Sequence, residues 1–168
     1  MITIREMHND EHDVHGKAFV VWRGWHDSYS GLISRDFLDR LTLEKCIEIS
    51  AGRTDGTLVA LNEEGSVIGF ASCGACRDED LTDTGEVYAI YVLKEYHGMH
   101  AGSALMRECL KRLSGYPAAV VWTLAENRKA IAFYEHMGFR KDGTEKTRVI
   151  GTPVKEIRLA LNLSGHRD

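Results

Sequence analysis

The segment with the clearest chemical potential runs from Glu86 to Leu105, where an apolar run leads into a loop of small residues. The loop at residues 97–103 has the sequence HGMHAGS, and residues with helical spacing follow it. Backbone N–H groups at a helix N-terminus bind anions, and small residues let a phosphate group approach the backbone closely. The pattern therefore predicts a phosphate site, and the alternative is a tight turn that binds nothing. The chain contains neither G-x-x-x-x-G-K-S/T nor a strand followed by G-x-G-x-x-G, so those two phosphate-loop motifs do not apply.

A second candidate is the C-x-x-C formed by Cys73 and Cys76, a spacing that serves both redox dithiols and zinc sites. A structural zinc site takes four ligands, but no second C-x-x-C exists, and Cys46 and Cys109 are isolated in the sequence. A redox dithiol would open a helix, whereas this motif ends an apolar run and enters an acidic segment. The eight histidines are scattered along the chain. We therefore expect neither thiol chemistry nor a metal site, and a dithiol or metal protein stays as an alternative.

The periodicity of apolar residues assigns these segments to strands and helices. Strands are predicted at 2–7, 58–61, 67–71, 87–92, 118–124, 139–150 and 154–163, where apolar residues alternate or run together. Helices are predicted from 11 to a break at Ser30 and Gly31, from 34 to 49, from 101 to the stop signals Gly115 and Pro117, and from the cap Asn127 to 137. This order predicts an α/β fold with a mixed, mostly antiparallel sheet of about seven strands, flanked by about four helices.

The length of 168 residues favours one domain over residues 1–168 with a substantial core. With 21 Lys and Arg against 25 Asp and Glu, the net charge is −4, which disfavours nucleic acid as a partner. No apolar run approaches the roughly 18 residues of a membrane span, and the first residues are acidic and dotted with His, unlike a signal peptide. We therefore expect a cytoplasmic protein with reduced cysteines that binds neither nucleic acid nor a membrane.

The combination of these elements resembles the GNAT superfamily of acyl-CoA-dependent N-acetyltransferases. The resemblance rests on the strand 87–92, the loop 97–102, the helix and apolar strand after it, Asn127, and the segment FYEHMGF at 133–139, and it covers nearly the whole chain. The pyrophosphate loop of that family reads Q/R-x-x-G-x-G/A. In this chain, His97 stands where the family has Gln or Arg, and His100 stands where it has its first loop glycine. The resemblance implies a GNAT-like sheet and acetyl-CoA as the co-substrate, without a metal.

The resemblance also implies which residues hold the coenzyme. The pyrophosphate is expected on the loop, and the pantetheine arm is expected to pair with the backbone of the central strand, at an edge that opens where the next strand splays away. Asn127 is expected to be both a helix cap and a coenzyme contact. The implied coenzyme-binding residues are Ile90, Tyr91, Val92, His97, Gly98, Met99, His100, Ala101, Gly102, Ser103 and Asn127.

Acetyl transfer to an amine requires proton transfer, because an amine with a pKa of about 10 is almost fully protonated at neutral pH. The resemblance aligns Glu86 with a position where some family members keep a general base; the alternative is a solvated glutamate at a strand edge. Tyr134 follows Asn127 by seven residues, which places both on one helix face. It matches the tyrosine that many members use as the acid, and its alternative role is that of a core aromatic.

The segment around Trp25 and Tyr29 resembles the N-terminal helices that border the acceptor pocket in a bacterial subset of the family. The alternative is an aromatic stripe in the core, which the same helical spacing predicts. We expect direct acetyl transfer from acetyl-CoA to a small-molecule or peptide amine, with no covalent enzyme intermediate, and a homodimer is compatible with that activity. The alternative from another class is a non-catalytic acyl-CoA-binding or sensing protein of the same fold.

Overall fold

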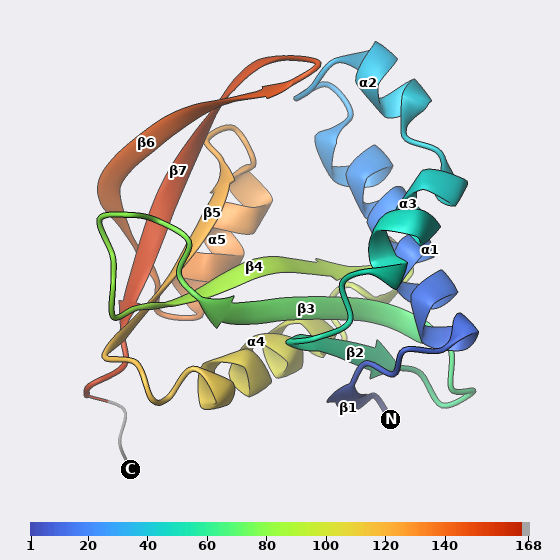
Figure 1. The fold of residues 1–168 in the computed structure, drawn as a ribbon, viewed down its shortest axis with the longest axis horizontal. Coiled ribbons are helices and arrows are strands. Elements are labelled where there is room, and N and C mark those ends of the chain that lie inside the picture. Colours follow the sequence, from blue (N-terminus) through green and yellow to red (C-terminus); the bar gives the residue numbers. More distant parts are fainter. Residues whose placement is uncertain (166–168) are drawn as a thin grey trace.

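The computed structural model describes residues 1–165, which form seven strands and five α-helices (Figure 1). The strands are β1 (Thr3–Glu6), β2 (Thr57–Leu61), β3 (Val67–Ala75), β4 (Gly85–Val92), β5 (Ala118–Leu124), β6 (Arg140–Ile150) and β7 (Thr152–Asn162). The helices are α1 (Glu11–Tyr29), α2 (Arg35–Arg40), α3 (Leu43–Ala51), α4 (Ala101–Arg112) and α5 (Arg128–His136), and the short 3₁₀ helix η1 (Lys94–Tyr96) precedes α4. The α/β fold and the strand order along the chain are confirmed.

All seven strands belong to one sheet with the order β1-β2-β3-β4-β5-β7-β6. Neighbouring strands are antiparallel except β4 and β5, which run parallel. The parallel pairing is short, because it joins residues 85–87 to residues 119–121 and then stops. Beyond this point the two strands diverge, and Figure 1 shows β2, β3 and β4 running across the direction of β5, β6 and β7. The gap between the two halves of the sheet positions the functional site.

The segment 34–49 forms two helices rather than the single one that its apolar spacing predicted, which brings the helices to five instead of about four. The backbone of Leu41 is extended and ends α2. The hydroxyl of Thr42 then accepts a hydrogen bond from the Lys45 amide, at 3.3 Å, and provides an N-cap from which α3 begins. The cap therefore interrupts a run of apolar residues that continues across the break.

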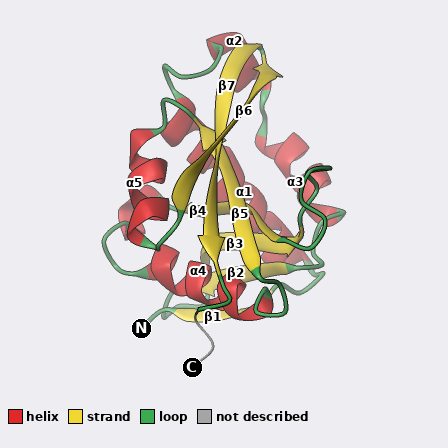
Figure 2. Ribbon diagram, turned by 90° about the vertical axis from the view of Figure 1, so that its left-hand side faces the viewer, coloured by secondary structure: helices red, strands yellow, loops and turns green. Residues whose placement is uncertain are grey.

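Helices cover both faces of the sheet. Leu58 and Ala60 of β2 pack in a cluster with α4, whereas Val59 between them packs in a second cluster with α1. This alternation is the one a strand with two buried faces requires. Figure 2 shows α5 and α3 on opposite sides of the sheet. Among residues 1–165, no helix has both the length and the apolar character needed to cross a membrane.

Candidate functional site

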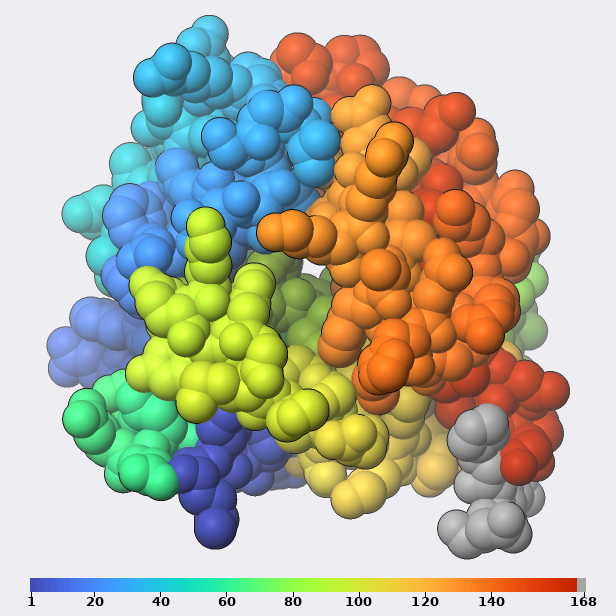
Figure 3. All heavy atoms as spheres, turned by 180° about the vertical axis from the view of Figure 1, so that it is seen from behind, coloured from blue at the N-terminus to red at the C-terminus, as the bar shows by residue number. Residues whose placement is uncertain are grey.

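The divergence of β4 and β5 opens into a cleft with a volume of about 2020 Å³. Its walls come from α1, β4, the loop at residues 97–103, β5, α5 and the β6–β7 hairpin. Figure 3 shows the hollow between the yellow-green atoms around η1 and the orange atoms of α5. Every site residue predicted from the sequence lines this cleft except Met99, whose side chain is exposed on the surface. The cleft therefore brings together residues from α1, β4, the loop at residues 97–103 and α5.

The loop at residues 97–103 presents backbone donors to the cleft. Gly98 and His100 have φ angles of 78° and 65°, and His100 is the only residue other than glycine with a positive φ in the part of the chain that the structure describes. The backbone at His100 thus keeps the conformation that glycine adopts most readily. Because α4 begins directly after His100, the first N–H groups of the helix, which have no partner inside it, lie at the cleft. This arrangement suits an anion.

The two histidines of this loop have different roles in its structure. The Nε2 atom of His97 lies 2.8 Å from the carbonyl oxygen of Val92, so the ring donates a hydrogen bond to the end of β4. His97 therefore ties the loop to the strand, although the family has Gln or Arg at this position. The side chain of His100 makes no capping hydrogen bond at the start of α4. Its imidazole contributes nothing to the helix cap and lines the cleft instead.

The β4 strand offers a backbone edge to the cleft. It pairs with β3 up to Val92, but its pairing with β5 stops after residue 87, so residues 88–92 have no strand partner on the cleft side. Ile90, Tyr91 and Val92 lie in this part and are half-buried. An unpaired strand edge presents N–H and C=O groups that an extended ligand can pair with. The splayed edge predicted for the coenzyme is confirmed, and the coenzyme contact itself stays a prediction.

Asn127 and Tyr134 reach the cleft from α5. The side-chain oxygen of Asn127 accepts a hydrogen bond from the Ala130 amide at 3.2 Å, which confirms Asn127 as the N-cap of the helix. Tyr134 is 7% exposed, and its ring packs edge-on against Phe133 and Phe139. Burial raises the pKa of the Tyr134 hydroxyl above its usual value, so the group stays protonated at neutral pH. The packing of its ring thus fixes Tyr134, and its protonated hydroxyl is available as a proton donor at the cleft.

Glu86 lies in the short stretch where β4 pairs with β5. It is only 1% exposed, so the alternative of a solvated glutamate at a strand edge is wrong. Its carboxylate accepts hydrogen bonds from Arg77, from Nη2 at 2.7 Å, from Nε at 3.4 Å and from the backbone amide at 3.0 Å. The guanidinium of Arg77 also lies 4.4 Å from the centre of the Tyr88 ring. Glu86 is thus a fixed, ion-paired carboxylate in the wall of the cleft.

A charged cluster that the sequence did not reveal holds the segment between β3 and β4 in place. Arg158 of β7 is 5% exposed and donates hydrogen bonds of 2.6–3.0 Å to three carboxylates, those of Asp78, Asp80 and Asp142. These carboxylates raise the pKa of Arg158 further. Trp122 also donates to Asp78, at 2.8 Å. The sequence offered two signals for this cluster: Arg158 stands among apolar residues of a predicted strand, and an acidic segment follows Cys76.

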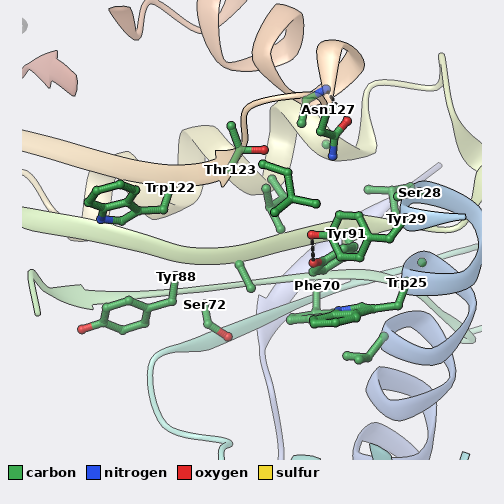
Figure 4. A pocket seen from close by; sticks show the side chains of 18 of the residues that line it. Trp25, Ser28, Tyr29, Phe70, Ser72, Tyr88, Tyr91, Trp122, Thr123 and Asn127 are labelled. Atoms are coloured by element: carbon green, nitrogen blue, oxygen red, sulfur yellow. Dashed lines mark hydrogen bonds between the residues drawn. The ribbon is translucent and has the colours of Figure 1, made fainter. Parts of the chain in front are cut away.

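The aromatic residues expected at the acceptor pocket line the cleft between α1 and β4. The rings of Trp25 and Tyr29 meet edge to face with centroids 4.9 Å apart, and Phe37 lies 6.0 Å from Trp25. The hydroxyls of Tyr29 and Tyr91 form a hydrogen bond of 2.7 Å, drawn as the dashed line in Figure 4. Trp25 and Tyr29 therefore face the cleft, and their contact with an acceptor stays a prediction. Glu156 also lines this cleft and was not among the residues predicted from the sequence.

The two cysteines of the C-x-x-C lie in different surroundings. Cys73 is buried in the cluster beneath α4, beside the thiol of Cys109. Cys76 is half-buried in the segment after β3, where its sulfur accepts a hydrogen bond from the Asp78 amide at 3.5 Å. All four cysteines are free thiols. The C-x-x-C therefore does not present its two sulfurs to one common site.

Known proteins resemble this chain in sequence and in fold. The model of the acetyltransferase (GNAT) family matches residues 7–139. YuaI of Bacillus subtilis, described as an uncharacterized N-acetyltransferase, is 32% identical over 162 residues, which cover 95% of this chain and 92% of that protein. The crystal structure of PH1933 from Pyrococcus horikoshii aligns with a TM-score of 0.76 at 21% identity, covering 96% of this chain and 98% of that one. The PaiA N-acetyltransferase of Thermoplasma acidophilum, solved with coenzyme A, aligns with a TM-score of 0.72 at 18% identity, covering 96% and 99%.

The chain belongs to the GNAT acetyltransferase family. The matched segment runs from the start of α1 through α5, so it contains the diverging strands, the loop at residues 97–103 and the helix of Tyr134. The protein is an acetyl-CoA-dependent N-acetyltransferase, and the family, fold and activity expected from the sequence are confirmed. The two solved structures support the fold, and the family model and the B. subtilis relative support the activity.

Proposed function

We propose that the cleft binds acetyl-CoA along the free edge of β4 and transfers the acetyl group directly to an amine that enters beside α1. The observation that carries this proposal is an unpaired strand edge that leads to a helix N-terminus in the same cleft. Such an edge suits the amide groups of a pantetheine arm, and the helix N-terminus suits a pyrophosphate. The coenzyme A in the complex of the T. acidophilum relative supports the same assignment.

Tyr134 is the proposed acid for the leaving thiolate. The thiol of coenzyme A resembles a cysteine side chain with a pKa of about 8.5, so a nearby proton donor makes the thiolate a better leaving group. The Tyr134 hydroxyl meets this need, because burial keeps it protonated and two neighbouring rings restrain its position. As the amine nitrogen forms its bond to the acetyl carbon and the C–S bond breaks, the hydroxyl proton passes to sulfur. The acylated nitrogen then releases its surplus proton, which returns to the Tyr134 oxygen and leaves a neutral amide and a neutral thiol.

Glu86 is the proposed group for removing the proton from the amine. Arg77 already donates to both carboxylate oxygens, so the geometry favours action through a water molecule over direct contact with the substrate. Oε1 already accepts two of these hydrogen bonds and Oε2 only one, so Oε2 keeps acceptor capacity that a water can use. The proton then leaves the ammonium group to this water and passes on to solvent, which frees the nitrogen lone pair for attack. No cysteine and no covalent enzyme intermediate takes part in these steps.

Calorimetry with acetyl-CoA and a thiol-release assay with a panel of primary amines test the proposal. We expect one binding site per chain, weaker binding at high salt because the pyrophosphate carries charge, and thiol release that depends on an amine. No binding at millimolar acetyl-CoA would refute the assigned site. Binding without thiol release for every amine would instead indicate a protein that senses acyl-CoA.

The acceptor that we propose is a small-molecule or peptide amine. The single domain over residues 1–168, the cytoplasmic location and the compatible homodimer stay predictions. Light scattering on the purified protein tests the homodimer, because the dimer has twice the mass of the chain.

A further inference from the structure

Glu156 of β7 has a buried carboxylate oxygen that accepts no hydrogen bond from residues 1–165. The residue is 6% exposed and lines the cleft, and its Oε1 atom is buried with no partner among residues 1–165. The guanidinium of Arg148 approaches it, but Nη1 stays 3.9 Å from Oε1, beyond hydrogen-bond distance, on a side chain that is 56% exposed. Burying a carboxylate without a hydrogen bond costs free energy, and native proteins do so rarely. Glu156 therefore needs an explanation other than the stability of the fold.

The register of the sheet explains why Glu156 faces the cleft. It lies directly opposite Leu124 of β5, and residues opposite each other in an antiparallel pair project from the same face. Leu124 packs with Ile150 in an apolar cluster at this end of the cleft. Arg158 lies two residues further along β7 on the same face, and there three aspartates satisfy its charge. The fold thus gives Arg158 a full set of hydrogen bonds, whereas Glu156 has only a 3.9 Å ion pair with the half-exposed Arg148, and its Oε1 accepts no hydrogen bond from the described residues.

The aromatic wall beside Glu156 does not supply the missing partner. Burial raises the pKa of the Tyr29 hydroxyl, and the negative charge of Glu156 raises it further. That hydroxyl is already engaged with the hydroxyl of Tyr91 at 2.7 Å. The ring of Trp25 packs against Tyr29 and presents apolar carbon to the cleft. The Glu156 carboxylate therefore sits at the edge of an aromatic pocket whose two tyrosine hydroxyls bond to each other.

We propose that Glu156 binds the protonated amine of the acceptor, and that the acceptor therefore carries an ammonium group on an apolar body. This inference rests on the proposed function, because it assigns the acceptor end of the same cleft. An ammonium N–H satisfies the carboxylate with a charge-assisted hydrogen bond, and aromatic faces attract the cation and pack against its carbon chain. Glu156 selects and positions the substrate. Glu86 lies opposite Val120, four residues along β5 from Leu124 and so about 13 Å away along the strand, and the amine proton passes to the water at Glu86 through further waters in the cleft.

Two probes that cannot be acetylated separate binding from turnover. N,N-dimethylphenethylamine is a tertiary amine that is protonated at neutral pH, and N,N-dimethylphenylacetamide is a neutral molecule of similar size. Their dissociation constants are measured by NMR with the protein saturated with coenzyme A, for the wild type, Glu156→Gln and Glu126→Gln. Glu126 is the matched control, because it is an exposed glutamate at the same cleft. We expect Glu156→Gln to weaken binding of the cation by about ten- to a hundredfold, and Glu126→Gln to leave it unchanged.

The neutral probe and thermal unfolding complete the test. The neutral probe should bind all three proteins alike. Glu156→Gln should unfold at the wild-type temperature or above it, because it removes a buried negative charge whose Oε1 lacks a hydrogen bond. A lower unfolding temperature would show that the carboxylate serves the fold and would overturn the proposal. Equal affinity of the wild type and Glu156→Gln for the cation, or no preference of the wild type for the cation, would overturn it as well. If thiol release from acetyl-CoA persists in those cases, the proposed function stands and only the role of Glu156 fails.

Discussion

The left-handed backbone at His100 allows a test in which two substitutions separate backbone strain from the imidazole ring. His100 has φ 65° and ψ 11°, a conformation in which a Cβ atom costs about 1–2 kcal/mol relative to glycine. Glycine loses more backbone entropy on folding than alanine does, and this loss offsets about 0.5–1 kcal/mol of the stability gained by removing the Cβ atom. The midpoints of these two ranges predict that His100→Gly has a free energy of unfolding about 0.75 kcal/mol larger than that of His100→Ala. Both variants lack the ring, so the comparison isolates the backbone.

Urea unfolding measures this difference directly, and thermal unfolding should show it as a rise of about 1–4 °C in Tm for a chain of this size. Equal stability of the glycine and alanine variants would refute the argument from strain.

Calorimetry on the same two variants examines the imidazole. We expect both to bind acetyl-CoA more tightly than the wild type does, because the ring occupies space where a phosphate group would approach the backbone. Weaker binding by both would show that the ring contacts the phosphate. That result would contradict the steric account.

The remaining predictions concern the proposed catalytic groups and the thiols. Tyr134→Phe should lower turnover by roughly a hundredfold or more with apparent affinities within a few-fold, and wild-type turnover in this variant would make Tyr134 a core aromatic. Because burial raises the pKa of Tyr134, its ionisation should not reduce wild-type turnover below about pH 10. Glu86→Gln should reduce turnover most at low pH, where free amine is scarcest, and leave acetyl-CoA affinity unchanged; an equal loss at every pH would speak against proton removal. Cys73→Ala combined with Cys76→Ser should keep turnover near that of the wild type, whereas stoichiometric zinc in the wild type that this variant loses would support a metal site.

The elements and the loop could be predicted because they depend on neighbouring residues. Asn127 caps α5 through an amide three residues away, and the apolar positions of α4 repeat at helical spacing. The break at Thr42 escaped prediction because apolar residues continue on both sides of it, so periodicity alone cannot separate one helix from two. Local signals thus predicted the type of each element better than its ends.

The partners of charged residues could not be predicted, because strand register and loop folding bring distant residues together. Arg158 meets Asp78 across 80 positions of sequence. Glu86 was expected as a candidate base next to the predicted strand 87–92, but its burial depends on a loop that folds back to place Arg77 on the carboxylate. The role of Glu156 is harder still to predict, because the residue is distinguished only by a carboxylate oxygen that accepts no hydrogen bond from the described residues. The sequence shows which charged residues are present, but only the tertiary structure shows which of them have partners.

The two halves of the sheet are joined through only three residue pairs between β4 and β5. If coenzyme amides pair with the free edge of β4, the ligand acts as an additional short strand and extends the contact between the two halves of the sheet. Ligand present at a hundred times its dissociation constant would then add about 2.7 kcal/mol to the free energy of unfolding, a sizeable share of the roughly 5–15 kcal/mol typical of a folded domain. The protein would accordingly resist unfolding and proteolysis most when acyl-CoA is abundant, so its abundance in the cell would follow the supply of its own substrate.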